Sequence, residues 1–283
     1  MTLIFYDDYL IFLKGESILT ENKYQLEELS EFALEIVRKA GQKALTYYGK
    51  GQPDTKFDEG LITEGELSLM EFFQDELNSR FPDYQVFRGA LEDSEYTHGD
   101  KRYLWIFDPL DGVTNVQAGI PIWGTSLALV ENFWPVCGVI YLPATGDEFQ
   151  AIAGRETLRG DTVINTALLD NISNVSVLLT YSRFHQQYHT TFPGKIRNMG
   201  CTTAHICYVA QGRADAAIIA NESYQGLAAA RVIIESAGGK IYKMDGTEFF
   251  LNEYLDGGRI SEHLLVTTPG IINQVLKTLK KIA

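Results

Sequence analysis

The strongest constraint on the fold is a change in hydrophobic period near residue 103. Before it, apolar side chains recur at helical spacing over residues 23–48 and again from Thr63 to Pro82. Thr63 and Glu66 match a capping box, so we expect the second helix to begin at Thr63. After residue 103, runs of β-branched and aromatic residues are separated by turn residues. The strands expected there are 103–107, 124–130, 136–141 and 148–153.

The second half of the chain alternates strands with helices, which predicts an α/β layer, whereas the first half is of the α+β type. No flexible linker is visible, and we expect an N-terminal part over residues 1–150 and a C-terminal part over 151–283. Residues 155–166 are expected to form a loop, and residues 3–13 one or two short strands. The remaining expected strands are 175–181, 214–220, 239–243 and 264–268, and the remaining expected helices are 202–211, 224–237 and 270–281.

The charge balance excludes one large class of partners. The 283 residues include 24 Lys and Arg against 37 Asp and Glu, which gives a formal net charge of −13. A chain this acidic is unsuited to binding nucleic acid, because phosphate neutralisation supplies most of that affinity. A phosphorylated ligand would need local help from a metal ion or a helix N-terminus.

Targeting signals and cysteine usage predict a cytoplasmic protein with no membrane partner. No stretch approaches the roughly 18 consecutive apolar residues of a membrane helix. The apolar N-terminal run contains Asp7 and Asp8 and lacks a basic region before it, so we expect no signal peptide. Three cysteines, Cys137, Cys201 and Cys207, form no C-x-x-C motif, and their odd number predicts a reducing compartment.

The segment 105–115 reads W-I-F-D-P-L-D-G-V-T-N and is the clearest candidate for a ligand site. A strand runs into Asp108, Pro109 interrupts its ladder, and Asp111 opens a turn with the next glycine. The two carboxylates can converge on one point together with the Leu110 carbonyl. Hard cations such as Mg²⁺ prefer oxygen ligands of this kind. A plain turn with two solvated Asp side chains is the alternative interpretation.

This segment and several others resemble the inositol monophosphatase family, the lithium-sensitive, magnesium-dependent phosphatases. The family motif is D-P-[IL]-D-G-T-x-N after a W-x-[IVF] strand. The resemblance covers residues 25–280 and implies a layered α-β-α-β-α sandwich that is often a homodimer. Further matching segments, in chain order, are 121–130, 136–141, 197–201, 212–216 and 235–239.

The resemblance also implies a set of site residues. In the family, a metal-bound water attacks a phosphate monoester, and Asp108, the Leu110 carbonyl and Asp111 match the central Mg²⁺ ligands. Lys56 matches a lysine beside the metals, and Glu66 matches an acidic residue of the site, although a capping role also explains Glu66. The substrate-binding residues that the resemblance implies are Gly112, Thr114, Gly200, Cys201 and Thr202.

The metal site departs from the family pattern at three places. Residues 89–91 read Gly-Ala-Leu where the family has G-E-E, so both glutamates are missing, and Glu92 or Asp93 would replace them only after a loop shift. Val113 stands where the family has a threonine that helps to activate the water. Gly226 stands where the family has the aspartate of a W-D pair. Two carboxylates suffice for one weakly held Mg²⁺, whereas several clustered cations need about four.

The turn at Gly200 opens a helix and could hold an anion through backbone N–H groups without any metal. Cys201 and His205 are four residues apart, which allows a nucleophile pair, with pocket lining and plain packing as the more ordinary alternatives. The glutamate that contacts the substrate ring in inositol-specific members falls near Ile219, and Glu222 would serve only with a gap in the alignment.

Two further patterns favour a structural interpretation. His185 and His189 have the spacing of helical zinc ligands, but no glutamate follows the first, and surface polarity explains both. Residues 155–160 could form a phosphate-contacting loop, but a solvated connection is the favoured interpretation.

The function that the sequence predicts is therefore a family scaffold with an eroded metal site. We expect a pseudophosphatase, or a repurposed member, that binds a small and possibly phosphorylated polyol, sugar or other metabolite. The alternative is an active Mg²⁺-dependent phosphatase of a small phosphorylated polyol, sugar or nucleotide, such as inositol monophosphate.

Overall fold

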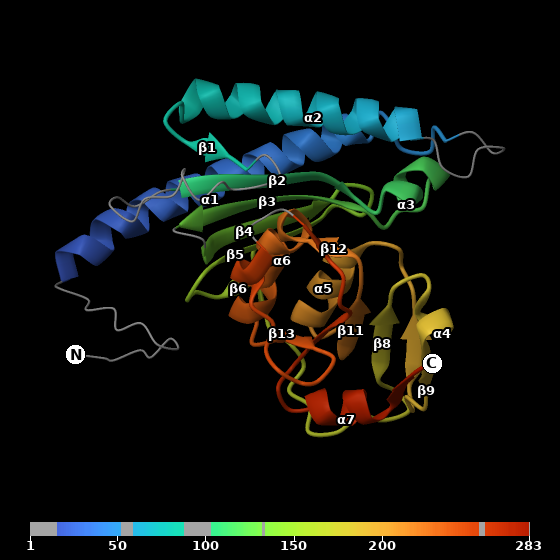
Figure 1. Ribbon diagram of the computed structural model, residues 1–283. Coiled ribbons are helices and arrows are strands. Elements are labelled where there is room, and N and C mark those ends of the chain that lie inside the picture. Colours follow the sequence, from blue (N-terminus) through green and yellow to red (C-terminus); the bar gives the residue numbers. More distant parts are fainter. Residues whose placement is uncertain (1–15, 52–58, 88–102, 132–133, 255–257, 283) are drawn as a thin grey trace.

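The structure is a computed structural model that describes residues 16–51, 59–87, 103–131, 134–254 and 258–282. Helices and sheets alternate in five layers (Figure 1). Two long helices cover one face of the first sheet, two helices lie between the sheets, and two short helices flank the outer side of the second sheet. The layered α-β-α-β-α sandwich expected from the sequence is confirmed.

The outer helical layer consists of α1 (Glu16–Ala44) and α2 (Glu59–Arg80). Both place an apolar face on the first sheet, where Phe32 contacts Trp105 edge to face and Phe73 packs on Phe107. All four rings are almost fully buried, so this layer is held mainly by the burial of apolar surface.

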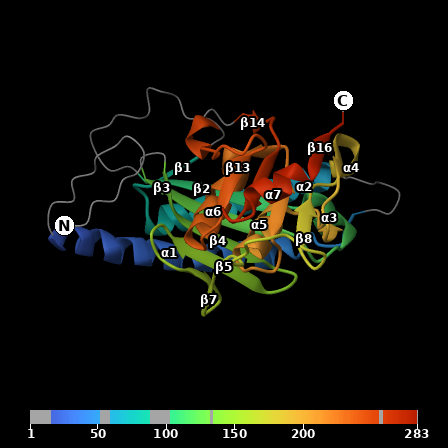
Figure 2. The same cartoon turned by 90° about the horizontal axis from the view of Figure 1, so that it is seen from below.

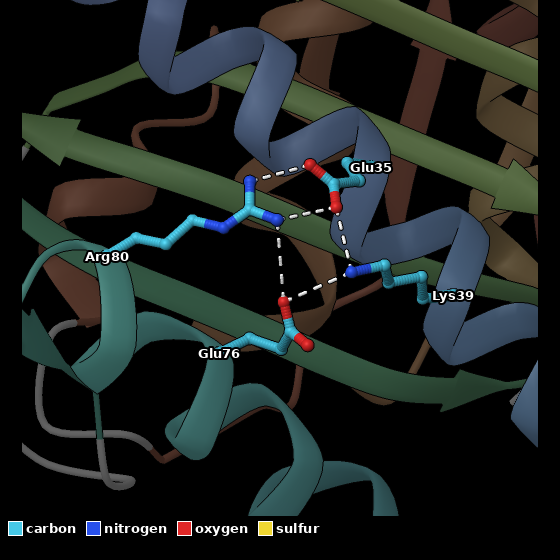
Figure 3. Close-up of polar contacts among 4 residues, drawn as sticks. All are labelled: Glu35, Lys39, Glu76 and Arg80. Carbon is cyan, nitrogen blue, oxygen red and sulfur yellow. Dashed lines mark hydrogen bonds and ion pairs between the residues drawn. The ribbon is translucent and has the colours of Figure 1, made fainter.

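An ion-pair network also joins α1 to α2 (Figure 3). Arg80 lies 2.6 Å from Glu35, and Lys39 bridges Glu35 at 2.8 Å and Glu76 at 3.3 Å. These side chains are between 28% and 44% exposed, so water weakens their attraction. We therefore expect the network to add little to the stability of the helix pair.

The first sheet has seven strands in sequential order, and only its first pair is parallel. A short helix, α3 (Val113–Ala118), leaves the end of the second strand. The strands are β1 (Gln85–Val86), β2 (Tyr103–Asp111), β3 (Gly124–Glu131), β4 (Trp134–Leu142), β5 (Asp147–Ile152), β6 (Thr157–Arg159) and β7 (Thr162–Ile164).

The second sheet has five strands in the order β10-β8-β11-β15-β13. Its bounds are β8 (Val177–Thr180), β10 (Lys195–Arg197), β11 (Ala216–Ile219), β13 (Lys240–Lys243) and β15 (Leu264–Thr267). Two separate strand pairs join distant segments. They are β12 (Glu222–Ser223) with β14 (Arg259–Ile260), and β9 (Tyr188–Thr190) with β16 (Leu279–Lys281).

The middle layer consists of α5 (Thr202–Ala210) and α6 (Tyr224–Ser236), which share one core with both sheets. Helix α6 lies so close to β4 that a Cβ on Gly138 would overlap the carbonyl oxygen of Ala229. Figure 2, viewed from below, shows α7 (Ile272–Lys277) outside the second sheet. The remaining short helices are α4 (Phe184–Gln187) and the 3₁₀ turn Leu251–Tyr254.

Three expectations about elements were wrong. Helix α2 begins at Glu59 because the buried Ile62 already packs in a helical turn, so Thr63 is not its N-cap. Residues 155–166 contain the hairpin β6–β7 instead of a loop. The last helix ends at Lys277, and the chain then turns into β16, which pairs with β9.

Several other expectations lie on residues that the structure does not describe. They are the strands expected over residues 3–13, the candidate site residue Lys56, and the segment 89–93. The division expected at residue 150 stays a prediction, and β5 spans that position. In the described part of the chain, no helix has the length and apolar character needed to cross a membrane.

Candidate functional site

The candidate site begins at the end of β2, where Asp108 and Asp111 follow a buried run. Strand β2 pairs with β3 at Asp108 and again at Asp111, with a register shift between them. The break expected at Pro109 is therefore a bulge inside β2, and the strand continues to Asp111. The hydroxyl of Thr125 donates to the Pro109 carbonyl oxygen at 3.0 Å and fixes this bend.

A glycine and an asparagine fasten the elbow to the segment before α5. Gly112 has a φ of 84°, and a Cβ there would lie 3.1 Å from the Cβ of Cys201. A side chain at Gly112 would therefore be strained and crowded. Asn115 donates through Nδ2 to the carbonyl oxygens of Ile122 at 2.6 Å and Met199 at 2.7 Å.

Asp111 lies at the N-terminus of α5. Its Oδ2 accepts hydrogen bonds from the Thr203 backbone N–H at 2.6 Å, the Thr203 hydroxyl at 2.8 Å and the Cys201 thiol at 3.3 Å. A helix N-terminus favours an anion of this kind. The turn that the sequence offered for a phosphate thus holds a carboxylate oxygen of the chain itself.

Glu222 is a third carboxylate at this site. Its Oε1 accepts a hydrogen bond of 2.6 Å from the Thr202 hydroxyl. A Cβ on Gly226 would lie 3.2 Å from Glu222 Oε2 and 3.7 Å from Asp108 Oδ2. Both carboxylates therefore border the space that the missing side chain of Gly226 leaves free.

The start of α6 holds Glu222 and Gly226 in place. Ser223 caps the helix by accepting a hydrogen bond from the Gly226 backbone N–H at 3.2 Å. Gln225 donates through Nε2 to the Phe107 carbonyl oxygen at 2.7 Å, which attaches α6 to β2 next to Asp108.

The clustering of acidic groups raises their pKa values. Burial, and then the negative charges of Asp111 and Glu66, raise the pKa of Asp108 to about 7. Burial, the charge of Asp111 and the charge of Asp108 raise the pKa of Glu222, although the Thr202 hydrogen bond opposes this. Burial also raises the pKa of Glu66. Each shift means that the charged form is poorly compensated in the absence of a cation.

Cys201 and His205 do not form a nucleophile pair. Nε2 of His205 accepts a hydrogen bond of 3.1 Å from the Met199 backbone N–H, and burial lowers the pKa of His205 to about 4. Burial and the charge of Asp111 raise the pKa of the Cys201 thiol, so its reactive thiolate is disfavoured. Packing and lining of the pocket account for both residues.

The remaining candidate residues are placed as follows. The Leu110 side chain is buried, Thr114 is exposed on α3, and Glu66 is half-buried on α2. His185 and His189 are both exposed on separate elements, as their structural interpretation predicted. Arg155, from the expected phosphate-contacting loop, pairs with Glu27 of α1 at 2.9 Å.

The pattern of residues 25–277 matches the model of the inositol monophosphatase family, which spans most of the chain. The chain belongs to the inositol monophosphatase family. The family membership expected from the sequence is thereby confirmed. Members of this family are generally Mg²⁺-dependent phosphatases.

Known proteins agree with this membership. A histidinol-phosphatase from Chlorobaculum parvum is 28% identical over 232 residues, which covers 78% of this chain and 88% of that protein. The inositol monophosphatase structure from Thermotoga maritima has a TM-score of 0.69 at 24% identity and covers 88% of this chain and 95% of that chain. An inositol monophosphatase from Staphylococcus aureus, solved with bound inositol monophosphate, has a TM-score of 0.68 at 17% identity. The match covers 88% of this chain and 92% of that chain. The two structures show that the fold is shared.

The described residues fit one Mg²⁺ ion better than several. Carboxylate oxygens of Asp108 and Glu222 face one space, and such oxygens suit a hard cation. Within the described ranges, however, no three His, Cys, Asp or Glu side chains are arranged as the ligands of one metal. Val113 and Gly226 bring no ligand atom from their side chains.

Proposed function

We propose that this family member binds a small phosphorylated polyol, sugar or related metabolite and hydrolyses it slowly or not at all. The ligand binds between the elbow at Asp108–Gly112 and the start of α5, with at most one weakly held Mg²⁺ ion. Gly200, Cys201 and Thr202 line the side of α5 in this proposal.

One observation carries the proposal. Asp111, a residue that the sequence offers as a metal ligand, has its Oδ2 engaged by three donors from α5. The backbone N–H groups that would hold a phosphate at this turn are partly used by the same carboxylate. Hydrolysis by the family route needs a cation that polarises the phosphate and lowers the pKa of its bound water. Among the described residues, no three His, Cys, Asp or Glu side chains are arranged to hold such a cation, which supports slow or absent hydrolysis.

The ligand class rests on relatives. The Staphylococcus aureus structure contains inositol monophosphate, and the Chlorobaculum parvum relative is named for a phosphorylated amino alcohol. Both ligands are small phosphate monoesters on a polar skeleton. The proposal extends this class to the present pocket without naming one compound.

A phosphate-release screen tests the proposal. Many phosphomonoesters are incubated with the protein and millimolar Mg²⁺, beside Asp108→Asn as a matched control. We expect turnover far below the usual range of roughly 1–10³ s⁻¹, together with a thermal shift from at least one compound. Turnover within that range that Asp108→Asn abolishes would overturn the proposal. A complete absence of thermal shifts would also count against it.

An active Mg²⁺-dependent phosphatase remains the second candidate, because Glu222 adds a carboxylate to the two expected from the sequence. The same screen separates the two candidates. The homodimer and the cytoplasmic location belong to the proposal as well, and light scattering on the purified chain measures the first.

A further inference from the structure

The space beside Gly226 is bordered by oxygen atoms from two different elements. Asp108 reaches it from β2, and Glu222 reaches it from β12. Thr202 donates to Glu222 Oε1, and Oε2 lies on the side of Asp108, with no hydrogen bond to it from the described residues. The arrangement thus presents two carboxylate oxygens to the space that Gly226, which has no side chain, leaves open among the described residues.

We propose that Glu222 and Asp108 together bind the single divalent cation of this pocket, and that Thr202 positions Glu222 for this role. This inference rests on the proposed function, since it gives the weakly held cation its ligands. Sequence comparison offered Glu222 only as a substrate contact that requires an alignment gap, and never as a metal ligand.

The local charge supports a cation as the occupant. Asp108 and Glu222 border the same space, because a Cβ on Gly226 would lie 3.7 Å from Asp108 Oδ2 and 3.2 Å from Glu222 Oε2. Neither carboxylate joins an ion pair in the part of the chain that the structure describes. Arg259 lies opposite Ser223 in the β12–β14 pair, and its Nη1 donates to the Asn221 carbonyl oxygen at 2.7 Å. A divalent cation such as Mg²⁺ or Mn²⁺ would neutralise both carboxylates at once.

The hydrogen bond from Thr202 has the geometry of an orienting contact. A carboxylate that binds a metal through one oxygen commonly accepts a hydrogen bond on the other, and loss of such a partner costs about 10–100-fold in metal affinity. Thr202 lies in the first turn of α5, so its hydroxyl is fixed by a regular helix. Glu222 is therefore held in one orientation before a cation arrives.

Gly226 belongs to the same arrangement. A Cβ at this position would lie 3.2 Å from Glu222 Oε2, which is too close unless the glutamate moves. A side chain at 226 therefore requires the Glu222 carboxylate to shift slightly from its observed position. Replacement of Gly226 by Asp should displace Glu222, and it should be tolerated better when Glu222 is shortened or neutralised.

Mn²⁺ binding to the full chain tests the proposal independently of activity. Free Mn²⁺ is followed by electron paramagnetic resonance during a titration, and Mg²⁺ competition gives the affinity for the second ion. We expect Glu222→Gln to weaken Mn²⁺ binding by at least about tenfold, and Thr202→Val to weaken it by a similar factor. Thr202→Ser keeps the hydroxyl and should stay within about twofold of the parent protein.

A charge control accompanies these variants. Asp161 is an exposed residue in the turn of the β6–β7 hairpin, so Asp161→Asn changes the net charge equally without touching the pocket. It should leave Mn²⁺ affinity unchanged. The swap variant Glu222→Gln/Gly226→Asp returns a carboxylate to the same space and should recover part of the binding lost in Glu222→Gln.

The outcomes are separable from those of the proposed function. Parent-like Mn²⁺ binding in Glu222→Gln overturns the inference, as does a parent protein that binds no Mn²⁺ at millimolar concentration. In either case a thermal shift with a phosphomonoester would leave the proposed function standing. Conversely, Mn²⁺ binding through Glu222 without any phosphomonoester shift would support the cation site and contradict the metabolite ligand.

Discussion

Individual residues of the site differ in how far the sequence could predict them. Asp108 and Asp111 end one buried strand, so their short separation along the chain was enough to predict that they belong to one site. Glu222 lies more than a hundred residues away, and its approach depends on the pairing of β12 with β14 and on the start of α5. No local pattern carries that information. An acidic residue just before the Ser223 helix cap was the only available signal.

The raised pKa of Asp108 predicts how stability depends on pH. Its folded-state pKa of about 7 lies above the unfolded value of roughly 3.9, so the folded chain binds more protons between these values. In the presence of a chelator, the free energy of unfolding should therefore fall as the pH rises through 7. Glu222 shifts in the same direction. Urea unfolding between about pH 5.5 and 8.5 measures this slope.

Asp108→Asn is the matched control for the pH series. The amide cannot ionise, so the decline in stability between those pH values should become shallower. An unchanged slope would mean that Asp108 is not the group responsible.

The three cysteines should be inert in the folded protein. Cys137, Cys201 and Cys207 are at most 2% exposed, and burial raises the pKa of each thiol. We expect native protein to resist iodoacetamide at neutral pH, and denatured protein to label at all three positions. Mass spectrometry after a timed exposure counts the adducts. Rapid labelling of Cys201 by iodoacetamide in the native protein would instead support a nucleophilic role for this residue.

Among the elements, the central strands were predicted within a few residues, whereas the starts of α1 and α2 and the short pairings were not. The β6–β7 hairpin was missed although Gly160 and Asp161 form a recognisable two-residue turn between its strands. Strand β16 could not be predicted, because its partner β9 lies about ninety residues earlier in the chain. The early start of α2 reflects tertiary packing of Ile62, which outweighed the capping pattern at Thr63.

The ion-pair network between α1 and α2 should contribute little to stability (Figure 3). Hydrogen bonds from Arg80 and Lys39 lower the pKa of Glu35 to about 2. Because the four side chains are partly exposed, Glu35→Gln should cost at most about 1 kcal/mol of unfolding free energy, and less at high salt. Glu31→Gln on the same helix, at an exposed position, serves as the control. Chemical denaturation at low and high salt gives both values.

The low pKa of Glu35 also predicts how the stability of the protein changes as the solution becomes acidic. Its contribution to stability is present above about pH 4.5 and is lost as the pH falls toward 2. A larger cost than stated, unaffected by salt, would show that Glu35 also positions the helices.

The contact between β4 and α6 should be far more sensitive. Gly138→Ala places a methyl group against the Ala229 carbonyl oxygen and should destabilise the fold by about 1–3 kcal/mol. Gly65 lies inside α2, and a Cβ there meets its nearest neighbour, Tyr47, at an ordinary 3.5 Å. Gly65→Ala should therefore stabilise the helix by about 0.5–1 kcal/mol. A melting temperature that falls in Gly138→Ala and rises in Gly65→Ala would confirm both predictions.

At the scale of the whole molecule, the layer order was implied by family resemblance, and periodicity alone supported only the mixture of α+β and α/β parts. The sequence did not indicate that α5 and α6, from the second half, fill the space beneath the sheet of the first half. Helical spacing shows which face of a helix is apolar but not which sheet it covers. Which sheet a helix covers is decided by contacts between segments that are far apart in the sequence.

This shared core predicts one cooperative unfolding transition. All three tryptophans, Trp105, Trp123 and Trp134, lie in or beside the first sheet, whereas far-ultraviolet circular dichroism reports on both halves. Because α6 packs on both sheets, urea curves from fluorescence and circular dichroism should coincide. Separated midpoints would instead show that residues 1–150 and 151–283 unfold as independent units.

The position of α6 between the sheets also has a consequence for synthesis on the ribosome. The strands of the first sheet are complete by Ile164, but the helices that cover its inner face end only at Ser236. Because synthesis proceeds at about 5–20 residues per second, that apolar face stays uncovered for several seconds. Nascent chains halted in this interval should recruit chaperones or aggregate, and chains halted after Ser236 should do so much less.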